Sequence, residues 1–233
     1  SGDPRDLHGV DRGQRQSCIR DSAEEAEDRA SARANEAEAV SGFLRDLIAE
    51  ADPWEAGAGV TVQDAIERAD GVLEERFADQ PALQATMRRT IGEAYLGLGL
   101  FERARDQFLR AIELGVDARG EDDPGVAESR LLLASACSRL GRTDETRQTL
   151  ERIIEADTGS DTEPSIPRGL ILRARFALIE QESLHADAEF DDVIARASAL
   201  LSEIKSFFGP EDDVSLRLTN SLAWMLLWTQ HPQ

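Results

Sequence analysis

Cysteine, histidine and long apolar runs are all scarce in this chain. Its two cysteines, Cys18 and Cys137, lie in different segments without metal-ligand spacing, and Cys137 falls where a helix needs a small core residue. Only three histidines occur; Glu182 and His185 have the spacing of half a di-iron site, but no second such pair is present. No run of 18 apolar residues and no secretory signal is evident. We therefore expect no metal, no cofactor and no direct membrane contact.

Positive charge is also in short supply. The sequence has 46 acidic and 26 basic residues, a net charge of −20, and Lys205 is its single lysine. Nucleic acids and anionic membrane surfaces attract basic faces, so neither is an expected partner. A basic peptide or protein patch is the electrostatic complement, although the same charge serves solubility alone.

Polarity and hydrophobic periodicity divide the chain into three parts. Residues 1–18 are polar and lack a period, which predicts a disordered tail. Residues 19–51 are alanine-rich, with Ala23, Ala30, Ala37 and Leu44 recurring every seven residues, which predicts an N-terminal helix or stalk. After a turn rich in glycine and proline, residues 60–233 show helical periodicity and should form one array; Thr61 is expected to cap its first helix.

Residues 85–118 carry small and large side chains at fixed offsets. These are Gly92, Tyr95, Gly99, Ala104, Phe108 and Ala111. Small residues allow two helices to approach, aromatic residues fill the adjacent space, and the middle glycine ends the first helix. The pattern resembles the tetratricopeptide repeat, in which pairs of helices stack.

A second copy of the pattern occupies residues 126–157. Ala134 corresponds to Gly92 and Gly141 to Gly99, an offset of 42 residues, while Thr146 replaces the motif's small alanine. A degenerate third copy covers 167–206, and 213–230 gives half a repeat. The sequence therefore predicts an all-α solenoid of about three and a half helical hairpins, preceded by a long N-terminal helix.

A wider resemblance covers roughly residues 36–228. It is carried by Phe43-Leu44, Asp52-Pro53, Val60-Thr61-Val62, Asp64-Ala65-Ile66 and Ala78-Asp79-Gln80-Pro81. The segment resembles the C-terminal repeat region of bacterial membrane-anchored serine/threonine kinases. The resemblance implies a sensory or scaffolding module on the extracytoplasmic, periplasmic side; a stand-alone chain would be cytoplasmic. Kinase motifs and a nucleophile elbow are absent from the sequence, so we expect no catalysis by this chain.

The repeat frame predicts which residues line the concave groove of such an array. They are Arg89, Glu93 and Leu96 from the first repeat, Glu128, Leu131, Ser135 and Arg139 from the second, and Arg175, Ile179 and Glu182 from the third. We expect the groove to bind a peptide or protein, with Arg89, Arg139 and Arg175 pairing its acids. Two alternatives are a merely solvated groove and a groove filled by the chain's own N-terminal helix.

Homodimerisation is the alternative function. The contacts would be Leu44 and Leu47 on the alanine-rich helix, or Trp224 and Trp228 at the apolar C-terminal end. Such a dimer would bring attached kinase domains together.

Overall fold

The computed structural model describes residues 31, 38, 41, 42, 45, 62–156, 166–184 and 190–230. The chain divides into two compact units, Ser1–Ala65 and Ile66–Gln233. The expected tail of residues 1–18, nearly all of the expected stalk of 19–51 and the expected cap Thr61 lie outside the described residues.

The three long described ranges contain eight helices and no strand, which confirms the all-α prediction. The helices are α3 (Val62–Arg76), α4 (Pro81–Gly97), α5 (Phe101–Arg119), α6 (Pro124–Arg139), α7 (Thr143–Glu155), α8 (Arg168–Ser183), α9 (Phe190–Phe208) and α10 (Asp213–Gln230).

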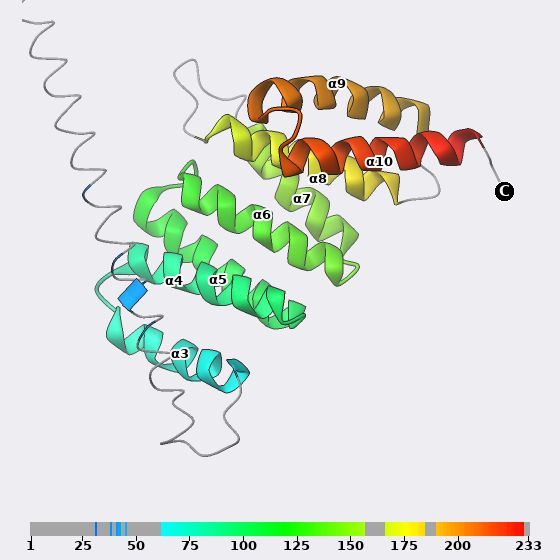
Figure 1. The fold of residues 1–233 in the computed structure, drawn as a ribbon. Coiled ribbons are helices and arrows are strands. Elements are labelled where there is room, and N and C mark those ends of the chain that lie inside the picture. Colours follow the sequence, from blue (N-terminus) through cyan, green and yellow to red (C-terminus); the bar gives the residue numbers. More distant parts are fainter. Residues whose placement is uncertain are drawn as a thin grey trace, which may run out of the picture. The chain divides into compact units, whose positions relative to one another are not determined.

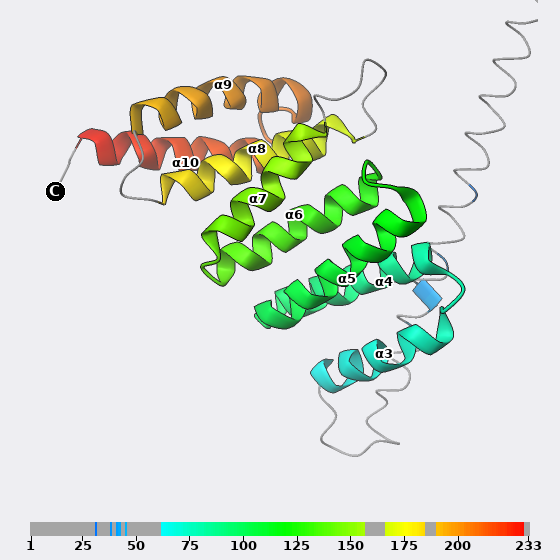
Figure 2. The ribbon, with the colours of Figure 1, turned by 180° about the vertical axis from the view of Figure 1, so that it is seen from behind.

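From α4 onward the helices form two layers. Each helix packs against its successor, and α4, α6, α8 and α10 also contact one another in turn. Figures 1 and 2 show α4 to α8 following one another along the stack, with α9 and α10 side by side at its end. The even-numbered helices therefore form one layer, and α5, α7 and α9 form the other.

Two glycines end the first helices of the first two pairs in the same way. Gly99 has φ 75° and Gly141 has φ 71°, in the left-handed region that favours glycine. After Gly99, the Leu100 amide donates to the Tyr95 carbonyl at 2.9 Å. After Gly141, the Arg142 amide donates to the Cys137 carbonyl at 2.9 Å. This hydrogen-bond pattern closes the helix end and reverses the chain.

The motif residues of the first pair form its core. Ala104 and Phe108 are fully buried and Tyr95 is 2% exposed. Gly92 faces the ring of Phe108 so closely that a Cβ would lie 2.6 Å from Cε1. In the second pair, Thr146 is buried and its hydroxyl donates to the Arg142 carbonyl at 2.9 Å, so the substitution leaves no unsatisfied donor.

A buried arginine ties α3 and α5 to α4. The Arg88 side chain is 7% exposed, and its guanidinium donates to Asp70 at 3.0 Å, to Glu74 at 3.0 Å and to Gln107 at 3.0 Å. Gln107 in turn donates to Asp70 at 2.7 Å. A buried charge is tolerated only when it is paired in this manner.

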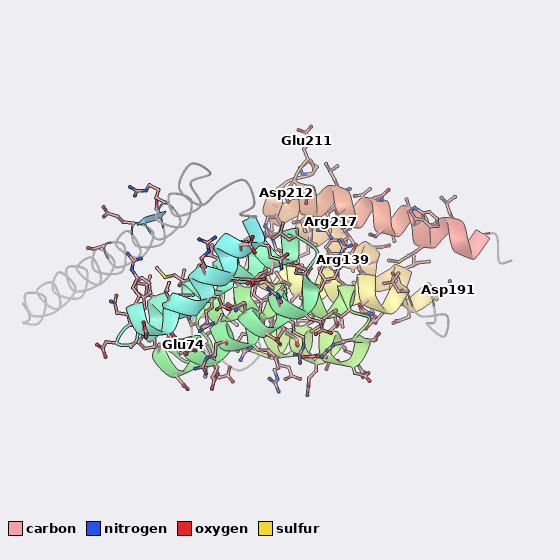
Figure 3. All side chains as sticks on the ribbon, turned by 90° about the horizontal axis from the view of Figure 1, so that it is seen from below. Glu74, Arg139, Asp191, Glu211, Asp212 and Arg217 are labelled. Atoms are coloured by element: carbon pink, nitrogen blue, oxygen red, sulfur yellow. The ribbon has the colours of Figure 1, made fainter. Side chains whose placement is uncertain are left out.

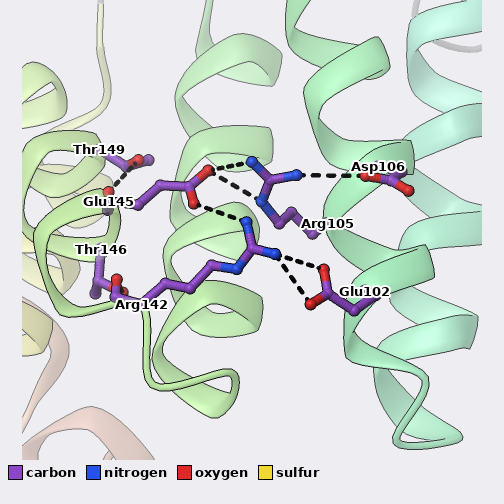
Figure 4. A network of polar contacts seen from close by, with 7 residues as sticks. All are labelled: Glu102, Arg105, Asp106, Arg142, Glu145, Thr146 and Thr149. Carbon is purple, nitrogen blue, oxygen red and sulfur yellow. Dashed lines mark hydrogen bonds and ion pairs between the residues drawn. The ribbon is translucent and has the colours of Figure 1, made fainter.

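A second polar network joins α5 to α7 on the odd-numbered layer (Figure 4). Arg105 donates to Glu145 at 2.7 and 3.0 Å, and Arg142 donates to both Glu102 oxygens at 3.0 Å. The hydrogen bond from Arg105 lowers the pKa of the Glu145 carboxyl below its ordinary value. These contacts hold adjacent repeats together on the layer opposite α6, α8 and α10.

Candidate partner-binding groove

The even-numbered layer carries a large concave site in its C-terminal half. A cavity of about 1040 Å³, hereafter the groove, is bordered by α6 on one side, α8 along its middle and α10 on the other, with two side chains of α7 beneath. All four helices pack against their neighbours in the stack.

Hydrogen bonds set the relative level of the three helices. Ser138 of α6 donates to Gln181 of α8 at 3.1 Å. From the other side, Ser221 of α10 donates to Glu180 of α8 at 3.1 Å, and Arg217 lies 3.3 Å from the same carboxylate. The C-terminal turns of α6 and α8 therefore lie level with the middle of α10.

Apolar side chains make up much of the groove wall. Leu131 of α6 and Ala177 of α8 line it, with the fully buried Leu150 of α7 beneath them. Leu184 and Trp224 line one end of the groove and are 74% and 57% exposed. Exposed apolar groups of this size beside polar ones are typical of sites that receive another molecule.

Six charged side chains line the groove: Arg139, Arg173, Arg217, Glu180, Asp212 and Asp213. They carry three positive and three negative charges, so the lining is neutral in a chain of net charge −20.

Arg139, Arg217 and Asp212 are labelled in Figure 3. Asp212 accepts from the Val214 amide at 2.9 Å, and Arg217 pairs with Glu180. Arg139 is exposed and pairs with no residue of the described ranges.

Three of the groove residues expected from the second repeat line this cavity. Leu131, Ser135 and Arg139 all face it from α6. Glu128, one turn earlier on the same helix, is outside its lining and forms an ion pair with Arg89 of α4.

The residues expected from the first repeat lie elsewhere. Arg89 forms an ion pair with Glu128, Glu93 is exposed, and Leu96 is half-buried. None of the three lines the groove. The cavity begins at α6, so the hairpin of α4 and α5 lines none of it. The ion pair between Arg89 and Glu128 instead joins α4 to α6.

The residues expected from the third repeat do not line this cavity. Arg175 pairs with Glu203 of α9 at 3.2 Å, Glu182 pairs with Arg196 of α9, and Ile179 is 4% exposed in the core with α9 and α10. The groove is instead lined from α8 by Arg173, Phe176, Ala177, Glu180 and Leu184. Buried residues of α8 lie on several of its faces, so its sequence has no single apolar stripe. The hydrophobic pattern therefore does not indicate which face of α8 lines the groove.

Of the four residues expected as dimer contacts, only Trp224 has a described side chain. Leu44, Leu47 and the side chain of Trp228 lie outside the described part of the chain. Trp224 lines the groove, a role that the sequence did not predict for it. Six other α10 residues, among them Asn220 and Met225, also face the groove.

The described residues offer few other functional features. They contain no cluster of three or more histidine, cysteine, aspartate or glutamate side chains placed to hold a metal ion. None of the described helices combines the length and the apolar character that crossing a membrane requires. Burial raises the pKa of the Cys137 thiol to about 11, which makes it a poor nucleophile.

Comparison with known proteins agrees with the repeat pattern. Residues 83–158 match the tetratricopeptide repeat model. No curated protein sequence is significantly similar to the chain.

Among solved structures, the Podosopora anserina putative kinesin light chain nearly identical TPR-like repeats are similar at 16% identity with a TM-score of 0.50. A second structure of these repeats, of a form with one residue substituted, gives 16% identity and a TM-score of 0.51. Both alignments cover 82% of this chain and 88% of the other. The fold is thus a tetratricopeptide-repeat-like solenoid, as the sequence predicts.

Proposed function

We propose that this chain is a non-catalytic recognition module that binds a segment of a protein partner in the groove between α6, α8 and α10. The observation that carries the proposal is the groove itself: a cavity of about 1040 Å³ with apolar walls, exposed large side chains at one end and polar groups between them. Recognition of extended segments uses this combination, since apolar pockets give affinity and polar groups fix register.

The length of the groove favours a peptide over a small molecule. Its lining on α8 runs from Arg173 to Leu184. At about 1.5 Å of rise per residue, that span is about 17 Å. It matches about five residues of extended chain at about 3.3 Å each. Pockets for small ligands are at most about as large as this cavity, and most are smaller.

The groove also offers hydrogen-bonding groups for a peptide backbone. Ser135 and Asn220 line it from α6 and α10, are exposed, and have no partner among the described residues. An extended segment presents a donor and an acceptor at every residue, so such groups can bind it without regard to its side chains.

Peptides selected from a displayed random library, followed by affinity measurements, test the proposal. Ser135→Trp would fill the groove from α6. Ser202→Trp places the same side chain on an exposed position of α9, outside the groove lining. We expect Ser135→Trp to weaken a selected peptide at least tenfold in fluorescence anisotropy, and Ser202→Trp to leave its Kd within about twofold. Equal effects of the two variants, or a library that yields no binder, would contradict the proposal.

The association with a signalling kinase belongs to the same proposal and depends on the resemblance of residues 36–228 alone. In that setting, partner binding in the groove would be the sensory or scaffolding event. Sequencing the reading frame upstream of this chain is the direct check. A kinase domain followed by a membrane helix is expected; an upstream region without a kinase domain would remove the association and leave the groove proposal intact.

A further inference from the structure

The groove arginines differ in whether the protein itself neutralises them. Arg217 pairs with Glu180 at 3.3 Å and also lies over the Phe176 ring, 5.4 Å from its centroid. Arg173 lies over the Phe208 ring at 5.7 Å. Arg139 alone has neither a carboxylate nor a ring among the described residues, although the chain has 46 acidic side chains. An exposed guanidinium that pairs with no described residue is available to a ligand.

Two other arginines expected to bind acids are already occupied. Arg89 pairs with Glu128, and Arg175 pairs with Glu203 at 3.2 Å. Because forming a new pair would require breaking the existing one, their net contribution to binding would be small. Among the described groove arginines, Arg139 and Arg173 lack a carboxylate partner, and only Arg139 is also without an aromatic ring beneath it.

Apolar side chains lie at the same level as Arg139. Ser138, its neighbour, is hydrogen-bonded to Gln181, and Leu184 follows one turn later on α8. Ser221 is hydrogen-bonded to Glu180, and Trp224 follows one turn later on α10. Leu184, Trp224 and Arg139 thus all line the C-terminal end of the groove.

The opposite end of the groove has a different charge. Asp212 and Asp213 begin α10 there, where the helix N-terminus already stabilises negative charge. Arg139, in the last turn of α6, interacts favourably with its helix C-terminus, and no described residue accepts a hydrogen bond from its guanidinium. The C-terminal end of the groove therefore combines Arg139 with apolar side chains, whereas the opposite end carries Arg173 of α8 together with Asp212 and Asp213.

We propose that Arg139 determines the specificity of the groove, which selects a protein segment carrying a carboxylate beside a large apolar side chain. The carboxylate accepts two hydrogen bonds from Arg139, a geometry that the planar guanidinium favours. The apolar side chain packs against Leu184 and Trp224. This inference depends on the groove being the binding site proposed above.

The test uses a displayed library of random peptides, about twelve residues long, selected separately on three proteins. These are the unaltered chain, Arg139→Glu, and the control Arg68→Glu. Arg68 is an exposed arginine of α3 with no partner in the described ranges, so the control makes the same change of charge outside the groove lining. Circular dichroism establishes that all three proteins are folded.

We expect the unaltered chain and Arg68→Glu to select peptides with aspartate or glutamate next to an aromatic or aliphatic residue. Arg139→Glu should bind those peptides about tenfold to a hundredfold more weakly, as the loss of a charge-assisted pair implies. It should itself select lysine or arginine at the acidic position. Arg139→Gln should weaken binding without inverting the preference.

Each outcome separates this inference from the proposed function. Peptides that are blocked by Ser135→Trp but keep their acidic preference on Arg139→Glu would overturn the inference and leave the groove proposal standing. If the peptides selected on the unaltered chain show no preference for aspartate or glutamate, the inference is likewise overturned and the groove proposal stands. A failure to select any peptide that Ser135→Trp blocks would overturn the proposed function itself.

Discussion

A methyl group added at Gly92 tests the close helix contact on which the first repeat is built. A Cβ at this position would lie 2.6 Å from Cε1 and 2.8 Å from Cδ1 of Phe108, whose side chain is fully buried. Overpacking of this kind costs about 1–3 kcal/mol. Alanine recovers about 0.5–1 kcal/mol relative to glycine within a helix. Because the buried ring has no free space to move into, we expect Gly92→Ala to destabilise the fold by about 1–2 kcal/mol.

Gly71 provides the matched control. It lies inside α3, and a Cβ there would have nothing within 4 Å. Gly71→Ala should therefore stabilise the protein by about 0.5–1 kcal/mol. In thermal unfolding followed by circular dichroism, each kcal/mol corresponds to about 2–4 °C for a chain of this length. The two variants should shift Tm in opposite directions; an increase in Tm for Gly92→Ala would refute the contact with Phe108.

Further predictions concern three polar groups. Removing Arg88 by Arg88→Ala should destabilise the fold by about 2–3 kcal/mol in urea unfolding, since Asp70 loses its charged partner. The pKa of Glu145 is lowered by Arg105, so its stabilising contribution is present above the unfolded pKa of about 4.3 and is lost as pH falls through the lower folded pKa. The stability difference between the unaltered chain and Glu145→Gln should accordingly shrink as pH falls from about 5 to about 3; a difference that grows would contradict the Arg105 contact. Burial raises the pKa of Cys137 to about 11, so, with the other cysteine replaced by serine, a thiol reagent at pH 8 should react only after denaturant is added. Fast labelling of the native protein would contradict its burial.

Much of the fold could be predicted from the sequence because each repeat position answers a local geometric need. Gly99 and Gly141 both adopt the left-handed conformation expected of a helix-ending glycine. Phe108 and Ala104 are fully buried where the pattern requires a large and a small residue. Such requirements involve only neighbouring helices, so the spacing of small and large residues along the sequence is enough to predict them.

The groove could be predicted only in part. The second repeat keeps its frame, so Leu131, Ser135 and Arg139 were placed on the lining side of α6. On α8, apolar residues such as Leu172 and Ile179 are buried against α9 and α10 together, and the periodicity does not separate the groove side from the α9 side. The lining from α10, including Trp224, was not predicted as part of the groove.

Side-chain pairing was the least predictable feature. Arg88 and Asp70 are 18 residues apart, and Arg105 and Glu145 are 40 apart. Their contacts depend on how helices are rotated within the stack, which sequence spacing does not specify. The same limit applies to Arg89 and Arg175, which pair with carboxylates of neighbouring helices.

The location of a bound peptide tests the central claim most directly. A peptide selected on the unaltered chain would carry benzoylphenylalanine in place of its large apolar residue, be cross-linked by light, and have its attachment sites read by mass spectrometry. Binding in the groove predicts cross-links to Leu184, to Trp224 and to the facing side of α6. Cross-links confined to α5, α7 or α9 would contradict it.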